Sequence, residues 1–139
     1  MARYSLDTNT ISHILRKDRL TVQKFRAAYA ADNEFLLCPI VYYELKRGFL
    51  RRDARNQISE MEEIVAQFRW QEFEPAIWAI AAQGWADARG RGHSPGDADL
   101  LIAYHAHHYS AVLVTANVKD FEFLPVQMEN WVPAASASR

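Results

Sequence analysis

The 139-residue sequence contains a single cysteine, Cys38, so no internal disulfide can form, which fits a reducing compartment. Apolar residues flank Cys38, and we interpret it as a buried structural thiol rather than a nucleophile. No apolar run approaches the roughly 20 residues that a membrane-spanning helix needs. The N-terminus also lacks the basic segment and long apolar segment of a secretory signal. These absences predict a cytoplasmic protein without a membrane segment.

The sequence also lacks an excess of charge of either sign. Its net charge is −1 and its pI is about 6.5, so the overall charge does not indicate a nucleic-acid-binding protein. We find no internal repeat, linker or low-complexity stretch, and 50% hydrophobic with 24% charged residues is typical of a globular chain. The length predicts one domain over residues 1–132, followed by a small polar tail at 133–139 that we expect to fray.

What the sequence does contain is an alternation of strand-like and helix-like segments. Apolar runs predict strands at 3–7, 35–38, 70–73, 111–114 and within 126–131. Apolar residues at helical spacing predict helices at about 10–16, 20–31, 39–52, 54–67, 75–89 and 95–109, with a loop at 115–121. This order predicts an α/β fold, a three-layer sandwich whose mostly parallel, roughly five-stranded sheet is covered by helices on both faces.

Two acidic residues in the first half of the chain are candidates for a site. Asp7 follows the first strand and precedes a helix that Asn9 or Thr10 is expected to cap, so it is either a turn carboxylate or a ligand. Glu44 lies on the same side of its helix as Val41. An acid on an inward face needs a partner, either a salt bridge or a bound cation.

Two more acids follow a glycine-rich loop and are separated by helix geometry. Ser94 is predicted to cap the helix, with Asp97 three residues later completing a capping box. Asp99 shares its face with Ile102 and Ala106, so we favour Asp99 for chemistry and treat Asp97 as an accessory at most. Both acids gain from the positive end of the helix dipole.

Asp120 lies just beyond the most apolar strand, again at a carboxyl end, where a turn role is the alternative. Thr115 and Asn117 at the same rim either hydrogen-bond a ligand or shape the loop. All four acids then map to one edge of one parallel sheet, where ligands bind in such folds. Carboxylates this close raise one another's pKa unless cations are present. Oxygen ligands without His or Cys favour Mg²⁺ or Mn²⁺ over zinc.

Other side chains have plainer interpretations beside functional ones. The basic residues Lys46, Arg47, Arg51 and Arg55 are either a solvated face or a track for RNA phosphates, because the three arginines recur every four residues. Three histidines (His105, His107 and His108) are expected on a helix surface rather than in a metal site. Two tryptophans seven residues apart (Trp78 and Trp85) are expected in the core, with a dimer contact as the second choice.

Four segments, in this order along the chain, resemble the motifs of PIN-domain nucleases. They are residues 6–10 (Leu-Asp-Thr-Asn-Thr), 41–48 (Val-Tyr-Tyr-Glu-Leu-Lys-Arg-Gly), 96–103 (Gly-Asp-Ala-Asp-Leu-Leu-Ile-Ala) and 114–121 (Val-Thr-Ala-Asn-Val-Lys-Asp-Phe). The dipeptide 130–131 (Asn-Trp) is similar to the usual ending of these proteins. Together the motifs span nearly the whole chain, and the small single-domain form resembles VapC-type toxins of toxin–antitoxin pairs.

The resemblance implies a Mg²⁺-dependent endoribonuclease that forms a homodimer and is inhibited by an antitoxin protein. By position, Asp7 and Asp99 would bind Mg²⁺ directly, while Glu44 and Asp120 would bind it through water or hold a second ion. Asn9, Thr115 and Asn117 would be supporting polar groups, and Asp97 has no firm counterpart. Which RNA is cut stays open, with transfer RNA a reasonable candidate.

Rival functions remain at this point. A phosphatase of the haloacid-dehalogenase type needs a second acid two residues after the first, and Asn9 stands there. A receiver-like phosphorylation domain needs an acidic pair near the N-terminus, which is absent. A PIN domain that binds RNA or protein with little catalysis is separated from the enzyme only by assay.

Overall fold

A computed structural model describes residues 1–133, and its centre is a five-stranded sheet with the order β3-β2-β1-β4-β5. The strands are β1 (Arg3–Leu6), β2 (Glu34–Leu37), β3 (Arg69–Trp70), β4 (Val112–Val114) and β5 (Met128–Glu129). Every neighbouring pair of these strands is parallel. The predicted α/β architecture is therefore confirmed. The predicted tail falls at 133–139, of which 134–139 lie outside the described residues.

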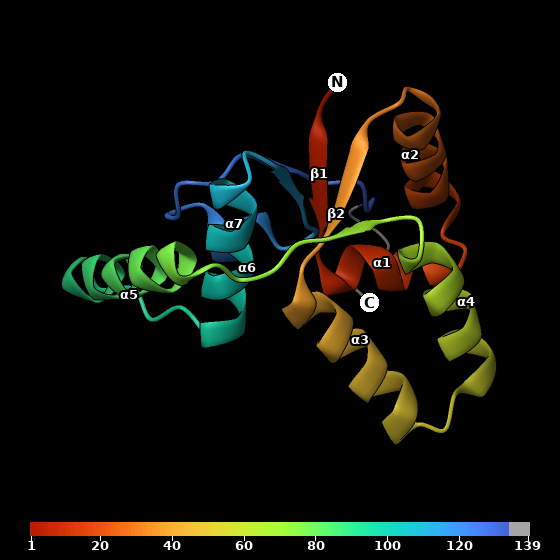
Figure 1. The fold of residues 1–139 in the computed structure, drawn as a ribbon, viewed down its shortest axis with the longest axis horizontal. Helices are drawn as coiled ribbons and strands as arrows, with labels where there is room; N and C mark the ends of the chain where they lie inside the picture. Colours follow the sequence, from red (N-terminus) through yellow and green to blue (C-terminus); the bar gives the residue numbers. More distant parts are fainter. Residues whose placement is uncertain (134–139) are drawn as a thin grey trace.

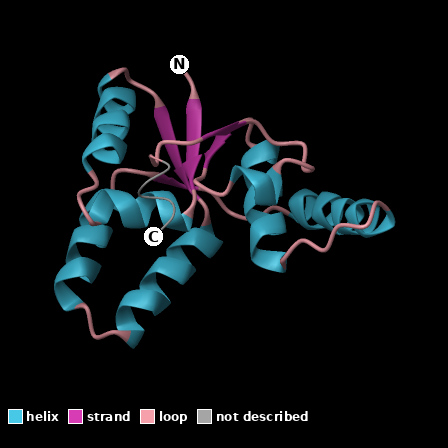
Figure 2. Cartoon of the chain, turned by 180° about the vertical axis from the view of Figure 1, so that it is seen from behind, coloured by secondary structure: helices cyan, strands magenta, loops and turns pink. Residues whose placement is uncertain are grey.

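Helices pack on both faces of this sheet, as parallel strands joined by crossovers require. They are α1 (Thr8–Leu15), α2 (Arg19–Ala30), α3 (Pro39–Arg51), α4 (Arg55–Val65), α5 (Pro75–Gly90), α6 (Asp97–His108) and α7 (Val118–Phe121). Figure 1 shows α2 and α4 to one side of the strands and α5 and α6 to the other, and Figure 2 shows the same layers from behind. No helix within residues 1–133 is long and apolar enough to cross a membrane.

The core forms where the apolar central strands meet the inner faces of the helices. Phe35 of β2 stacks on Phe68 with ring centroids 5.5 Å apart and meets Phe25 of α2 edge-on at 5.3 Å. Trp131, beyond the last strand, packs edge-on against Tyr4 of β1 at 5.2 Å. This cluster joins both ends of the described chain to the middle of the sheet.

Cys38 lies between β2 and α3 and is fully buried, as predicted. Burial raises the pKa of its thiol to about 12. The thiol is therefore protonated at neutral pH, and Cys38 is a packing residue rather than a nucleophile.

Three local features differ from the prediction: two helix caps and one short helix. Asp7 itself caps α1, because its carboxylate accepts the Thr10 amide at 2.9 Å, so neither Asn9 nor Thr10 is the cap. Gly96, not Ser94, precedes α6, which begins at Asp97. The predicted capping box is wrong because the Ser94 hydroxyl instead accepts a hydrogen bond from Arg89 at 2.5 Å.

The third difference is the segment after β4, which was predicted to be loop throughout and contains the one-turn helix α7. Just before α7, the Asn117 N–H donates a hydrogen bond to Thr115 Oγ1 at 3.0 Å. This turn places Asp120 in the first turn of α7, directly beyond the carboxyl end of β4.

The order of the strands alone indicates where a ligand would bind. Chain connections leave β1 toward β2 on one side, whereas β4 pairs with β1 on the other, so the order reverses at β1. In open parallel sheets the crevice at such a reversal, outside the carboxyl ends of the strands, is where ligands bind. Leu6 and Val114 are the last paired residues of β1 and β4, and Asp7 follows at this point.

Candidate active site

Asp7 is the most buried acid of the site, with 6% of its surface exposed. Its backbone N–H extends the β1–β4 ladder by donating to Val114 O at 3.0 Å, so the chain direction at Asp7 is fixed by the sheet. Burial is the largest influence on its carboxyl group and raises the pKa above the usual value. Hydrogen bonds from Thr115 and Thr10 oppose this rise, and the nearby charge of Asp99 adds to it. Asp7 is therefore a buried carboxyl group held in a fixed position at the carboxyl end of β1.

Thr115 is the buried polar group next to Asp7, and its role follows from its partners. Its Oγ1 accepts the Asn117 N–H, which leaves the hydroxyl proton available for the Asp7 carboxylate. Thr10 donates its N–H to Asp7 and its hydroxyl to Val114 O, each at 2.9 Å. The Thr115 and Thr10 contacts hold Asp7, and Asn117 contributes its backbone N–H to Thr115. A supporting part for Thr115 and Asn117 toward a ligand stays a prediction.

Glu44 reaches the same edge from the second turn of α3 and is half-buried. Thr8, the first residue of α1, donates its hydroxyl to Glu44 Oε1 at 2.6 Å. The partner that the inward-facing acid needs is therefore a hydroxyl of the neighbouring helix rather than a salt bridge. This hydrogen bond joins the acid on α3 to the residue that follows Asp7.

Asp99 and Asp120 form the exposed half of the site. Asp99 lies in the first turn of α6. Although the residue is exposed, partial desolvation of its carboxyl group, followed by the charges of Asp120 and Glu44, raises the pKa of that group. Through these influences each of the four acids is electrostatically coupled to another: Asp7 to Asp99, and Asp99 to both Asp120 and Glu44. The structure thus brings all four predicted acids to one edge of the sheet.

Whether these residues suit a divalent cation depends on their donor atoms and on their spacing. All four offer carboxylate oxygens, the ligands that Mg²⁺ and Mn²⁺ prefer. As the side chains stand, no three acids, histidines or cysteines among residues 1–133 are grouped closely enough to hold a metal ion. The donor chemistry and the shared charge fit a hard cation, while the described side-chain positions do not form a closed ligand set.

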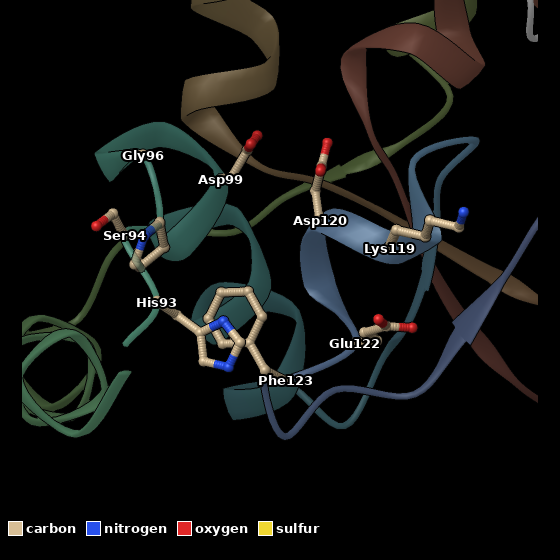
Figure 3. Close-up of a pocket in the computed structure, with 9 residues that line it drawn as sticks. His93, Ser94, Gly96, Asp99, Lys119, Asp120, Glu122 and Phe123 are labelled. Atoms are coloured by element: carbon tan, nitrogen blue, oxygen red, sulfur yellow. The ribbon is translucent and has the colours of Figure 1, made fainter. Parts of the chain in front are cut away.

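Asp99 and Asp120 also line a pocket with a volume of about 570 Å³. Figure 3 shows their carboxyl groups at one end and the rings of His93 and Phe123 at the other, with Lys119 to one side. The full lining is His93, Ser94, Pro95, Gly96, Asp99, Lys119, Asp120, Glu122 and Phe123. Of the four acids, only Asp99 and Asp120 line this pocket.

Two predicted accessory residues are placed elsewhere. Asp97 is two residues from Asp99, about 200° around the helix, and it lines a groove with Trp78, Trp85 and Leu101 on the α5 side. Asn9 lines a separate cleft between α1, α3 and α4. The structure does not bring Asp97 toward the acids, and Asn9 points to a neighbouring surface.

The predicted basic track is divided by the fold. Because α3 ends at Arg51 and α4 begins at Arg55, the arginines do not form one helical stripe as predicted. The Lys46 ammonium donates to Glu62 Oε1 at 3.1 Å, Arg55 pairs with Asp53, and the Arg47 guanidinium lies 5.0 Å from the Tyr43 ring centroid. Lys46, Arg47 and Arg55 thus have contacts within the protein. A part in RNA binding for the four basic residues stays a prediction.

Two other expectations about α5 and α6 are wrong. His105, expected on the helix surface, is fully buried and its Nε2 bonds the Gln71 carbonyl at 2.8 Å, with burial lowering its pKa. Trp78 and Trp85, expected in the core, are 51% and 44% exposed. The helix α5 contacts the protein through its smaller residues, which leaves the indoles outside.

Several residues that the structure places at the site were not found from the sequence. The sequence pattern indicates Asn9 as the polar support, whereas in the structure its neighbour Thr8 holds Glu44. Lys119 immediately precedes Asp120 within the fourth motif, so the sequence already indicates that Lys119 lies near the site. The facing of His93 and Phe123, 30 residues apart, had no signal in the pattern of the chain.

Comparison with known proteins agrees with this fold. The PIN domain family model matches residues 4–124. Ribonuclease VapC1 of Haemophilus influenzae (strain R2866) is 31% identical over 132 residues, which cover 92% of this chain and 97% of that protein. Ribonuclease VapC2 of Rickettsia felis is 28% identical over 130 residues, with the same shares covered. A crystal structure of VapBC2 from Rickettsia felis bound to a DNA fragment from their promoter matches with a TM-score of 0.85 at 26% identity, covering 94% of this chain and 99% of that one.

Proposed function

The chain belongs to the PIN-domain family, and from this premise we propose that it is a Mg²⁺-dependent endoribonuclease of the VapC type, the toxin of a toxin–antitoxin pair. The observation that carries the proposal is the meeting of four carboxylates, from four separate chain segments, at the carboxyl edge of β1 and β4. Relatives named as ribonucleases support RNA as the substrate class, with transfer RNA the candidate.

Asp7 and Asp99 are the proposed direct ligands of the cation, with Glu44 and Asp120 holding it through water or binding a second ion. When bound, Mg²⁺ offsets charge on the phosphate and lowers the pKa of an attacking water. The chain fixes the ligands: the Thr10 amide and the Thr115 hydroxyl hold Asp7, and the Thr8 hydroxyl holds Glu44. Manganese is a proposed substitute, since it shares the preference for oxygen ligands.

Asp99→Asn is the sharpest test, because Asp99 is exposed and its replacement should leave the fold intact. Loss of groups that only support metal ligands costs about 10–100-fold, so loss of a proposed ligand should lower RNA cleavage at least about 100-fold. RNA ends are sequenced after expression of wild type and variant, and cleavage by purified protein is measured with Mg²⁺ and after chelation. Equal cleavage by wild type and Asp99→Asn, or full activity in chelator, contradicts the metal-site mechanism.

Asp97→Asn is the matched control, since it removes the same charge from the same helix turn on the side facing α5. It should cut RNA within about twofold of wild type. If wild type binds RNA without cutting it under any divalent cation, the chain is instead a binding PIN domain, the alternative that the sequence left open.

A partner protein is the second part of the proposal. Solved structures of relatives include VapBC complexes, and on that basis we expect an antitoxin protein to inhibit this chain, in a cytoplasmic setting. Co-expression with the product of a short neighbouring reading frame should abolish cleavage and give a co-purifying complex. A neighbouring product that neither binds nor inhibits contradicts this part alone.

A homodimer is the third part, and the exposed tryptophans give it a surface. Trp78 and Trp85 flank a groove of about 400 Å³ between α5 and α6 that Leu101 also lines. Large apolar side chains gathered on one surface mark interaction sites. Trp85→Glu should shift the protein to monomer in sedimentation measurements. Ile80→Glu is the control, since Ile80 is 46% exposed but lies about 200° around α5 from Trp78.

A further inference from the structure

We propose that the pocket beside Asp99 and Asp120 is a nucleobase subsite, in which a base of the RNA next to the cleaved phosphate stacks on the imidazole of His93. This inference rests on the proposed ribonuclease function and adds to it a place for the substrate. Three observations support it: the stacked rings of His93 and Phe123, the hydrogen bonds that fix the segments bearing these rings, and the charge of the pocket.

The ring pair is a flat platform. The imidazole of His93 and the ring of Phe123 are stacked with centroids 4.3 Å apart and planes inclined by only 6°. Phe123 is half-buried and packs against the core, whereas His93 is exposed. Phe123 therefore supports one face of the imidazole, and the other face is free of the core. Unpaired RNA bases are held by stacking on aromatic side chains of this kind.

Both rings are fixed relative to the acids. Phe123 follows α7, three residues after Asp120, and the Leu124 N–H donates to Phe121 O at 2.9 Å to close this turn. His93 is six residues before Asp99, and its N–H donates to Ala88 O at 2.8 Å at the end of α5. The two segments that supply Asp99 and Asp120 thus also supply the two rings. Figure 3 shows Asp99 and Asp120 at one end of the pocket and His93 and Phe123 at the other.

The charge of the pocket favours a base over a second phosphate. Three carboxylates (Asp99, Asp120 and Glu122) line it against one ammonium, that of Lys119. A phosphate away from the cation would be repelled, while a neutral base would not, and Glu122 offers an acceptor for its N–H groups. The volume of about 570 Å³ lies within the usual range of small-ligand pockets, roughly 300–1,000 Å³.

The test compares His93→Ala with His93→Phe on short single-stranded RNA, after the bond cut by wild type has been mapped. Stacking on an aromatic side chain contributes enough per base that its loss should raise KM roughly tenfold. The change should appear mainly in KM, because a stacked base is bound alike in ground and transition states. His93→Phe keeps a flat ring and should remain within about threefold of wild type. Thermal melting of both variants confirms that the exposed position leaves the fold unchanged.

A second measurement identifies the base. On synthetic RNA that lacks the base on one side of the mapped bond, the KM of wild type should rise to that of His93→Ala. On this RNA the KM values of the two proteins should differ by less than about twofold. The same change on the other side should leave the tenfold difference between them.

The outcomes separate this inference from the proposed function. If wild type cuts no RNA, the proposed function fails and the subsite fails with it. If wild type cuts and His93→Ala is equally active, the subsite alone is refuted. Equal loss in His93→Ala and His93→Phe also refutes stacking, because a flat ring then does not suffice.

Discussion

Gly84 permits the close contact of α5 and α6. Replacing it with alanine should destabilise the protein if packing dominates and stabilise it if helix propensity dominates. A Cβ at this position would lie 2.5 Å from Cε2 of Tyr104 and closer still to its Cζ and Oη. Tyr104 is buried on α6, so its ring has little room to withdraw. Helix propensity alone predicts that alanine stabilises the protein by about 1 kcal/mol.

Packing should outweigh that gain. Overfilling a packed contact costs about 1–3 kcal/mol, and a contact this short belongs at the upper end of the range. We therefore expect Gly84→Ala to lower the free energy of unfolding by about 1–2 kcal/mol, which for a chain of this size lowers Tm by roughly 3–8 °C.

Gly48 of α3 is the matched control, because a Cβ there meets nothing within 4 Å. Gly48→Ala should raise the free energy of unfolding by about 0.5–1 kcal/mol. Urea unfolding followed by circular dichroism measures both variants. In a Tyr104→Ala background the cost of Gly84→Ala should disappear. A stabilised Gly84→Ala, or a cost that persists without the Tyr104 ring, would refute the reasoning.

Three further predictions concern the site and its surroundings. Thr8→Val removes the hydroxyl that holds Glu44 and should lower RNA cleavage about 10–100-fold, while Thr8→Ser retains it; equal activity of the two variants contradicts a positioning role. Burial lowers the pKa of His105, so the unfolded chain takes up the proton first as the pH falls. The contribution of His105 to stability is therefore full above about pH 6.5 and should decrease below it. Thermal melts from pH 8 to 5 should show a smaller fall in Tm for His105→Gln than for wild type, and an identical fall contradicts the assignment of this pH dependence to His105. Arg51→Ala should reduce the slope of log affinity against log salt for single-stranded RNA by about 0.7 if Arg51 contacts a phosphate, whereas Lys46→Ala, whose ammonium is already paired with a carboxylate of α4, should change it less.

The sequence predicted the position of the acids because the geometry of parallel sheets leaves few choices. Apolar runs at 35–38 and 111–114 identify central strands, and all such strands end at the same edge. Asp7 follows β1 directly, so its position needs only the fold class, whereas Asp120 lies in α7 beyond β4 and its position depends also on that one-turn helix. Asp99 was assigned from its inward-facing neighbours, yet it is exposed. It lies in the first turn of α6, at the end of the helix, while the residues that share its face are buried deeper.

The buried face of α5 was not predicted correctly, because helical periodicity identifies apolar residues without regard to their size. Its buried residues are Ile77, Ala81, Gly84 and Ala88. Small side chains at steps of three and four allow helices to approach closely, and the large residues are then left outside. The spacing of the small residues was readable from the sequence, and it indicates the packed face better than the tryptophans do.

The site divides into a rigid half and an exposed half, and this division decides which substitutions are informative. Asp7 caps α1, receives hydrogen bonds from two threonines and is buried, so its replacement perturbs the fold together with the chemistry. Asp99 and Asp120 instead stand at the rim of the pocket and are exposed. Because the buried half is constrained by folding, differences in which RNA is cut should arise from the exposed half and from the rings beside it. Activity lost in an Asp99 variant therefore reports on chemistry, whereas activity lost in an Asp7 variant reports on chemistry only if its Tm is unchanged.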